Sequence, residues 1–304
     1  MRGPLKEAAV ARLFNAYVIV DWTAAAKPGS GPDSVLIGVL KRDVRFRLAF
    51  EAFVLPTRAE AEKRLVVILD DLKKRGERAF VGFDFPLGFP RGLASALKLT
   101  GEPWLAVWDY LDKMVKDKAD NTNNRFGVGA ETNRRTTGGP FPFWGCPPRD
   151  TLTTLQPKRA HEHGEGDLPE FRRADQAVNG PSIWKLYYAG ASGPQAILGI
   201  PLVRRLKRAR GEAMKVWPFE TGWNAMGEAD LAGVELLAAE VMLGLVPTSP
   251  APGEGKEQAQ ARGLAERIAR LDEAGKLGQA FAAPKGVGED QVHASLEEGW
   301  ILNL

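Results

Sequence analysis

The chain has 304 residues, of which 44% are hydrophobic and 26% charged, and its formal net charge is +3. This composition is typical of a folded globular protein and excludes a disordered or fibrous chain. The single cysteine, Cys146, excludes an intrachain disulfide framework and favours a reducing compartment. Because the N-terminal segment lacks the apolar core of a signal peptide and no apolar run could cross a bilayer, we expect a cytoplasmic protein with no membrane partner.

The first half of the chain predicts a β-β-β-α-β order. Residues 16–21 (AYVIVD) have the β-branched and aromatic composition of a buried strand, and residues 34–40 and 44–55 follow through links short enough for an antiparallel meander. Thr57 and Glu60 have the spacing of a capping box, which predicts that a helix begins there. Residues 78–84 (RAFVGFD) are the fourth predicted strand.

The second half is less regular. Residues 85–215 are rich in Pro, Gly, Trp and Asn, and we expect helices only near 104–118 and 195–210. We interpret 85–215 as an insertion after the fourth strand that covers one end of the sheet. Residues 233–241 are the fifth predicted strand, ending near Glu240, and 256–274 form an amphipathic helix. The expected fold is one α/β domain over residues 1–304, with a mixed five-stranded sheet flanked by helices.

Two aspartates end predicted strands, and they are the main candidates for a functional site. Asp21 closes the first strand and Asp84 the fourth, and ligands of open α/β sheets collect at the carboxyl ends of strands. Two carboxylates held close together repel one another, which favours a hard cation such as Mg²⁺ or Mn²⁺. Glu240 and Glu257 are further acids that could complete a two-metal site. The plainer alternative is that each aspartate caps a turn, and Glu257 also suits the first turn of a helix.

Several short strings resemble a known family. They include VDWTAA at 20–25, GFDFPLGFP at 82–90, NNRFGV at 123–128, FWG at 143–145, SIWKL at 182–186, LGIP at 198–201, VWPFET at 216–221 and EEGWIL at 297–302. Together with the β-β-β-α-β order, they are similar to the DUF429-type predicted nucleases of the ribonuclease H-like superfamily. Some members of the bacterial subgroup that this chain resembles are labelled as molybdopterin-guanine dinucleotide or cobalamin synthesis proteins.

The resemblance implies a metal-dependent hydrolase in which Asp21 and Asp84 are the principal ligands. Glu240 matches an acid that ends a late strand in the family, and Glu257 stands where the family tends to have Asp at the start of a helix. Thr23 replaces the usual serine after Asp-Trp and keeps a hydroxyl group for substrate binding. Pro194, in a segment that normally reads Val-Gly-Ser-Gln, removes a backbone donor and weakens the case for an anion-binding loop.

Basic residues are candidates for substrate binding. Arg125, in the expected irregular insertion, could hold a phosphate bidentately or could pin its loop to the body through carbonyl groups. A basic run near 204–210 could contact a nucleic-acid backbone, although such runs are usually solvated helix faces. Its candidate residues for substrate contact are Arg204, Arg205 and Arg208.

Three functions remain open from the sequence. The first is a nuclease that uses two divalent cations to hydrolyse a phosphodiester in a nucleic acid or nucleotide. The second is a nucleotide- or cofactor-binding protein of the molybdopterin or cobalamin type, which would use the same cleft without cutting nucleic acid. The third is a catalytically silent ribonuclease H-like scaffold, because a fold does not determine a function.

Overall fold

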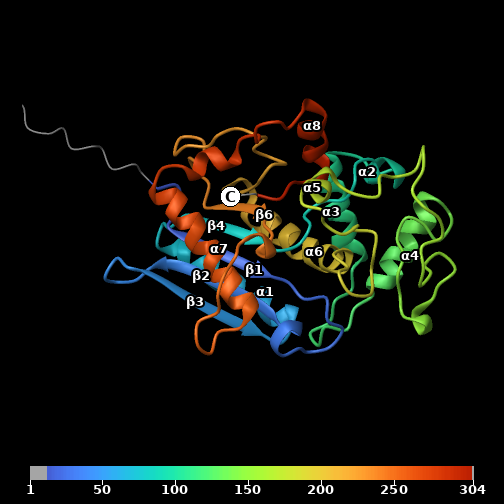
Figure 1. Ribbon diagram of the computed structural model, residues 1–304, viewed down its shortest axis with the longest axis horizontal. Helices are drawn as coiled ribbons and strands as arrows, with labels where there is room; N and C mark the ends of the chain where they lie inside the picture. Colours follow the sequence, from blue (N-terminus) through green and yellow to red (C-terminus); the bar gives the residue numbers. More distant parts are fainter. Residues whose placement is uncertain (1–11, 303–304) are drawn as a thin grey trace, which may run out of the picture.

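A mixed sheet built around β1 (Ala16–Asp21) organises the computed structural model, which describes residues 12–302. On one side β1 pairs antiparallel with β2 (Val35–Arg42), which in turn pairs antiparallel with β3 (Leu48–Leu55). On the other side β1 pairs parallel with β4 (Ala79–Phe83). The carboxyl ends of β1 and β4 therefore lie side by side at the same end of the sheet (Figure 1).

The sheet continues beyond β4 with two more parallel strands. β6 (Leu236–Glu240) pairs with β4, and the short edge strand β5 (Met214–Val216) pairs with β6. The strand order is β3-β2-β1-β4-β6-β5, so the sheet has six strands rather than the predicted five. The prediction missed β5 because three residues are too few for a periodic pattern, and only pairing with β6 fixes them as a strand.

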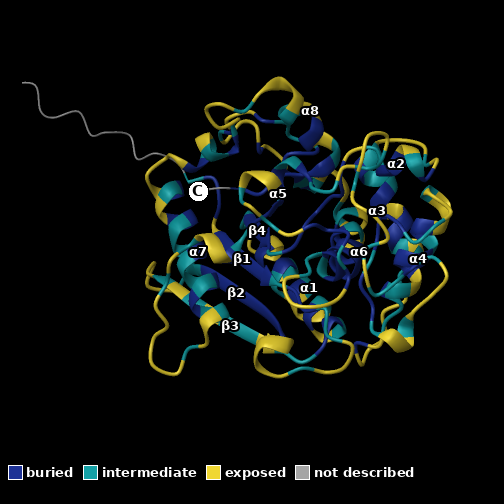
Figure 2. Ribbon diagram, turned by 45° about the vertical axis from the view of Figure 1, so that its right-hand side comes forward, coloured by how far each residue is buried: buried dark blue, intermediate teal, exposed yellow. Residues whose placement is uncertain are grey.

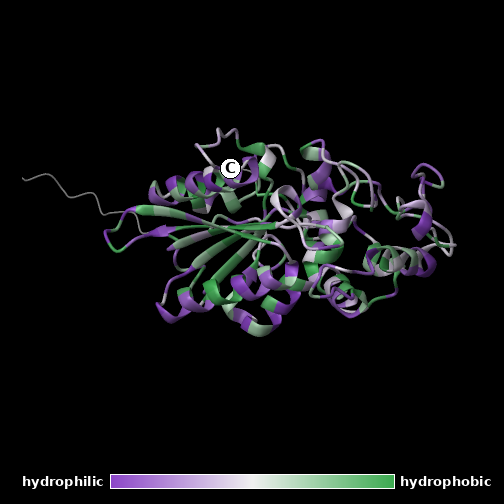
Figure 3. Ribbon diagram, turned by 90° about the horizontal axis from the view of Figure 1, so that it is seen from below, coloured by the Kyte–Doolittle hydropathy of each residue, from purple (hydrophilic) through white to green (hydrophobic). Residues whose placement is uncertain are grey.

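Helices cover both faces of the sheet and enclose two apolar cores (Figure 3). Alternate residues of β1 serve the two cores: Val18 and Val20 pack on one face, and Tyr17 and Ile19 on the other. The first face is covered by α1 (Arg58–Lys74), whose N-cap Thr57 accepts a hydrogen bond from the backbone N–H of Glu60 as the capping box predicts. The second is covered by α7 (Lys256–Glu273). Figure 2 shows the buried strands between these helices.

The chain between β4 and β5 gathers beyond the end of the sheet where β1 and β4 finish (Figure 1). It contains two of the expected helices, α3 (Pro103–Met114) and α6 (Gly193–Arg210). Helices that the sequence did not predict are α2 (Leu93–Ala96), α4 (Arg125–Thr136), α5 (Arg173–Ala177) and, near the C-terminus, α8 (Glu289–Glu298).

The expectation of irregular structure around Arg125 is wrong, because this residue begins α4. Two glycines, Gly127 and Gly129, lower the helix propensity of this segment and conceal it in the sequence. Gly129 is there for packing: a Cβ atom at this position would lie 2.5 Å from Cδ1 of Leu186. Tertiary contact thus outweighs local propensity in α4.

Among residues 12–302, none of the helices combines the length and apolar character that crossing a membrane requires.

Candidate functional site

Asp21 and Asp84 follow register partners on neighbouring strands. Val20 of β1 is paired with Phe83 of β4, and the backbone N–H of Asp84 donates to the carbonyl oxygen of Val20 at 2.8 Å. Neighbouring strands lie about 4.8 Å apart, and residues at the same register point to the same face. Val20 and Phe83 pack in the core under α1, so the next residues, Asp21 and Asp84, point toward the face that α7 covers. The structure thus brings the two predicted acids together.

The electrostatics of this pair are unfavourable in the protein alone. Burial raises the pKa of Asp21 to about 6, and the charge of Glu257 adds to the shift. Burial likewise raises the pKa of Asp84 to about 7, assisted by the negative charge of Asp21 and opposed by the backbone N–H of Leu243, which donates to Oδ1 of Asp84 at 3.0 Å. Within the described residues no Arg, Lys or His pairs with either carboxylate. A bound cation would offset both the cost of burying these negative charges and the repulsion between them.

Glu240 occupies a different environment from the two aspartates. It is the register partner of Phe83, it lines a small cavity together with Asp84, and its negative charge adds to the raised pKa of Asp84. Arg172 binds both of its carboxylate oxygens at 2.7 Å, and the backbone N–H of Leu87 donates to Oε2 at 2.9 Å. Both Glu240 and Arg172 are buried. Glu240 already has a cationic partner, and this arrangement favours a structural role over metal ligation.

Glu257 lies on the same face as the aspartates. It stands in the first turn of α7, the helix that covers that face, and it is half-buried. Its negative charge contributes to the raised pKa of Asp21. Glu257 therefore interacts electrostatically with Asp21, whereas the acid that acts on Asp84 besides Asp21 is Glu240.

The donor set fits a cation that needs few protein ligands. Residues 12–302 contain no group of three or more His, Cys, Asp and Glu side chains arranged to hold a metal ion. Mg²⁺, however, commonly binds through one or two carboxylates and completes its coordination with water and substrate phosphate. Asp21 and Asp84, which are half-buried at the carboxyl ends of neighbouring strands and lack a cationic partner, meet that requirement. The two-metal site expected from four acids stays a prediction, and in the structure one of the four, Glu240, is paired with Arg172.

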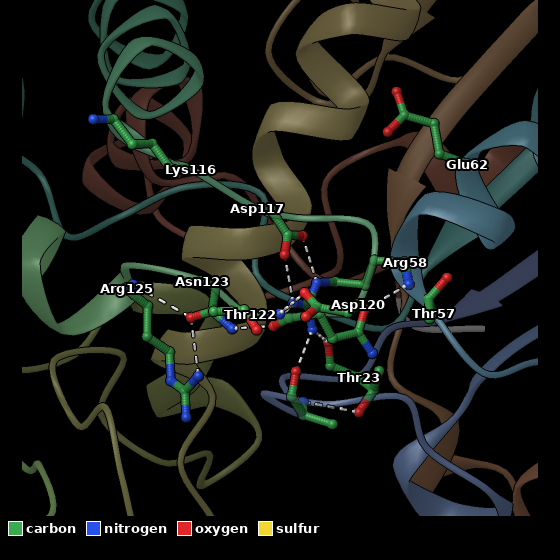
Figure 4. A network of polar contacts seen from close by, with 12 residues as sticks. Thr23, Thr57, Arg58, Glu62, Lys116, Asp117, Asp120, Thr122, Asn123 and Arg125 are labelled. Atoms are coloured by element: carbon green, nitrogen blue, oxygen red, sulfur yellow. Dashed lines mark hydrogen bonds and ion pairs between the residues drawn. The ribbon is translucent and has the colours of Figure 1, made fainter.

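A buried arginine fixes the loop that follows Asp21 (Figure 4). Arg58, at the start of α1, donates to the carbonyl oxygens of Thr23 at 3.2 Å and Ala25 at 2.7 Å. The same guanidinium binds both carboxylate oxygens of Asp117 at 2.6 Å and the carbonyl of Asn121 at 2.8 Å. Arg58 thus joins the Asp21 loop to the segment that precedes α4.

Thr23 lies in this fixed loop and is buried. Its Oγ1 accepts a hydrogen bond from the backbone N–H of Ala25 at 3.1 Å, so the hydroxyl hydrogen remains available to donate. This arrangement is compatible with the predicted contact between Thr23 and substrate.

Arg125 lies near the same loop (Figure 4). It does not pin its segment through carbonyl groups: Nη1 donates to Oδ1 of Asn123 at 3.0 Å, and the guanidinium carbon lies 4.5 Å from the ring centroid of Phe126. Arg125 is only 9% exposed, and its Nε has no hydrogen-bond partner in the described residues. Burial and the charge of Arg58 lower the pKa of Arg125, so the charged form would be stabilised by an anion.

A cavity of about 570 Å³ connects these residues. Asp21, Thr23 and Arg125 line it, together with Tyr187 and Gln195. A smaller cavity of about 150 Å³ is lined by Asp84, Glu240 and Arg172. The first turn of α6 contributes to both, with Gln195 in the larger cavity and Ser192 in the smaller.

The basic run of α6 is neutralised by neighbouring acids. Arg204 pairs with Asp109 at 2.6 Å, Arg205 with Glu62 at 2.6 Å, and Arg208 with Asp112 at 2.9 Å. The guanidinium groups therefore face α3 and α1, and these contacts do not support a free basic surface for a nucleic-acid backbone.

Sequence reasoning missed the two arginines that organise the site, Arg58 and Arg172. Each is almost fully buried, and their acidic partners Asp117 and Glu240 lie 59 and 68 positions away in the chain. The sequence offers no local pattern that identifies such pairs. A weak signal was available for Arg58, because an arginine directly after an N-cap is unfavourable to the helix dipole and needs another reason to be there.

No family model, no curated protein and no solved structure matches this chain in the comparisons with known proteins.

Proposed function

We propose that this protein is a divalent-metal-dependent phosphodiester hydrolase with a ribonuclease H-like fold of the DUF429 type. The observation that carries the proposal is the pair of half-buried carboxylates, Asp21 and Asp84, at the ends of adjacent parallel strands without a cationic partner. The order β3-β2-β1-β4-β6, with β2 antiparallel to its neighbours, supports the fold assignment.

The proposed roles follow from position. Asp21 and Asp84 would hold Mg²⁺ or Mn²⁺, and the Leu243 backbone N–H keeps the Asp84 carboxylate oriented. Such an ion, when bound, would polarise a phosphoryl oxygen of the substrate and lower the pKa of a water molecule. Arg125 would bind a phosphate oxygen in the large cavity, and the Thr23 hydroxyl would donate to substrate. Glu257 would hold a water molecule or, through its negative charge, raise the pKa of Asp21.

Hydrolysis of bis(p-nitrophenyl) phosphate with Mg²⁺ or Mn²⁺ tests the proposal. Asp21→Asn and Asp84→Asn should each lower the rate at least 100-fold with an unchanged circular dichroism spectrum, because amides cannot replace anionic ligands. Asp71→Asn is a matched control, since Asp71 is exposed on α1 and, among residues 12–302, its side chain forms an ion pair with Lys74 alone, at 3.8 Å. Wild-type activity in the Asp21→Asn/Asp84→Asn double variant would reject the proposal.

A second function is favoured by the size of the cavity. A volume of about 570 Å³ suits one small molecule. A nucleotide- or cofactor-binding protein without hydrolytic activity would use the same residues. Mass spectrometry of the denatured protein would reveal a copurified nucleotide or pterin in that case.

A further inference from the structure

Three side chains that line the large cavity carry buried polar atoms without a hydrogen-bond partner within residues 12–302. These atoms are Nε of Arg125, Nε1 of Trp22 and Oε1 of Gln195. Trp22 is 3% exposed and Arg125 9% exposed. An unsatisfied buried polar atom costs about 1–3 kcal/mol, and native proteins retain few of them. Three of the six side chains that carry such atoms in the described residues line this one cavity, which marks it as the place where polar groups without protein partners gather.

The unpartnered atoms come from three separate elements. Trp22 follows β1, Arg125 begins α4, and Gln195 lies in the first turn of α6. The start of α6 is held in place by close packing, since a Cβ atom on Gly193 would lie 2.1 Å from the carbonyl oxygen of Ile183. The start of α6, which carries Gln195, is therefore fixed before any ligand binds, and this lowers the entropic cost of binding.

One wall of the cavity is aromatic and exposed. Tyr187 is 38% and Tyr188 49% exposed, and both line the cavity. Their ring centroids lie 4.8 Å apart, and Tyr187 meets Phe126 edge-on at 6.2 Å. Tyr188 also adopts a φ of 74°, a left-handed conformation that is strained for a tyrosine. Strain of this kind concentrates at functional sites, where it holds a side chain in a required position.

Charge is distributed across the cavity. Asp21, the proposed metal ligand, and Arg125 both line it. A phosphate group between a cation at Asp21 and the Arg125 guanidinium would have positive charge on two sides. The two exposed tyrosine rings are tilted by 60° to one another, and each offers a face on which an aromatic base can stack.

We propose that the cavity binds a single nucleotide, with its phosphate at Arg125 and its base on Tyr187 and Tyr188. This inference rests on the proposed function and names the substrate class of that site as a nucleotide or nucleotide ester rather than a long nucleic acid. The cavity volume of about 570 Å³ suits a small molecule, and the pairing of Arg204, Arg205 and Arg208 with acids leaves no free basic surface at these residues for a long nucleic acid.

Isothermal titration calorimetry at pH 8 with three probes tests the inference. The probes are adenosine 5′-monophosphate, inorganic phosphate and a 20-nucleotide single strand, each with Mg²⁺ and again with EDTA. We expect adenosine 5′-monophosphate with Mg²⁺ to bind about tenfold more tightly than inorganic phosphate, because base stacking adds about a factor of ten. The single strand should bind no more tightly than the mononucleotide.

Variants separate the two halves of the cavity. Tyr187→Ala/Tyr188→Ala should abolish the tenfold advantage and leave phosphate binding unchanged; both side chains are partly exposed, so the fold is not at risk. Arg125→Gln should weaken both ligands about tenfold. The controls are Phe46→Ala, an exposed aromatic in the β2–β3 link, and Arg75→Gln, an exposed arginine paired with Glu77.

Equal binding of nucleotide and phosphate, or an unchanged nucleotide affinity in the tyrosine double variant, would overturn the inference. So would a single strand that binds tenfold more tightly than the mononucleotide and is insensitive to Arg125→Gln. The proposed function fails separately, when hydrolysis of bis(p-nitrophenyl) phosphate survives in the aspartate variants. Nucleotide binding that persists in EDTA with the same tyrosine dependence would support the cavity assignment even then.

Discussion

Arg172 holds Glu240 through two hydrogen bonds of 2.7 Å, and neither side chain is exposed to solvent beyond 4%. The same guanidinium also binds both oxygens of Asp175, at 3.0 and 2.7 Å. A single buried cation thus neutralises the acid that ends β6 and ties it to the segment before α5. Glu240 thus has a cationic partner that Asp21 and Asp84 lack, although its negative charge still adds to the raised pKa of Asp84.

Replacing Arg172 should therefore be costly. Arg172→Met leaves two buried carboxylates without their cation, and we expect the free energy of unfolding to fall by about 3–5 kcal/mol at pH 8. Urea denaturation measures the loss. Arg75→Met, at an exposed pair, should change it by less than about 0.5 kcal/mol. A loss below about 1 kcal/mol for Arg172→Met would mean that Glu240 does not depend on Arg172.

Asp84→Asn should stabilise the protein in a pH-dependent manner. The folded-state pKa of Asp84 is about 7, above its ordinary value of 3.8, so the folded protein binds this proton more tightly than the unfolded chain. The contribution of the protonated Asp84 to the unfolding free energy is fully present below about pH 4 and is lost as the pH rises through 7. The asparagine in the variant does not titrate, so the variant loses no stability for this reason as the pH rises.

Without metal, we therefore expect Asp84→Asn to match the wild type near pH 4 and to exceed it by roughly 2–4 kcal/mol at pH 8. Denaturant unfolding in EDTA from pH 4 to pH 8 measures this difference, and Asp71→Asn should show a flat difference. If the difference in unfolding free energy between Asp84→Asn and the wild type is the same at pH 4 and at pH 8, the Asp84 carboxylate is not destabilised by its surroundings.

The two glutamates should differ in their effect on metal binding. Glu257→Gln removes a charge that acts on Asp21, and we expect it to weaken Mn²⁺ binding several-fold. Glu240→Gln should change Mn²⁺ affinity less than twofold, because Arg172 already neutralises Glu240. Calorimetric titration of both variants at pH 8 makes the comparison, and the reverse ranking would restore Glu240 as a ligand.

Arg58→Lys should disturb both stability and the site. Lysine cannot reproduce the bidentate pair with Asp117 together with the bonds to the carbonyls of Thr23, Ala25 and Asn121. We expect a loss of about 3 kcal/mol in unfolding free energy and faster amide exchange in residues 23–25. Exchange rates equal to those of the wild type would show that the loop is fixed by other contacts.

The sequence predicted the parts of the fold that have strong local patterns. β1, α1 and β4 were found because strand composition and the Thr57 cap are local signals, and the convergence of Asp21 and Asp84 follows from where their strands end. β5 and α4 were missed because pairing and packing, rather than propensity, determine them.

The role of Glu240 was harder to predict than its position. Its strand was identified, yet the two-residue alternation along β6 places Glu240 with Leu236 and Ala238, on the face opposite Leu237 and Ala239. The buried partner Arg172 comes from a part of the chain with no recognisable pattern. Long-range ion pairs of this kind appear only when the chain is folded.

Anomalous X-ray scattering from crystals grown with Mn²⁺ tests the central claim most directly. The account predicts a manganese peak in coordinating contact with a carboxylate oxygen of Asp21 and one of Asp84, and no such peak in crystals of Asp21→Asn/Asp84→Asn. Manganese bound elsewhere while both aspartates keep only protein and water contacts would contradict it.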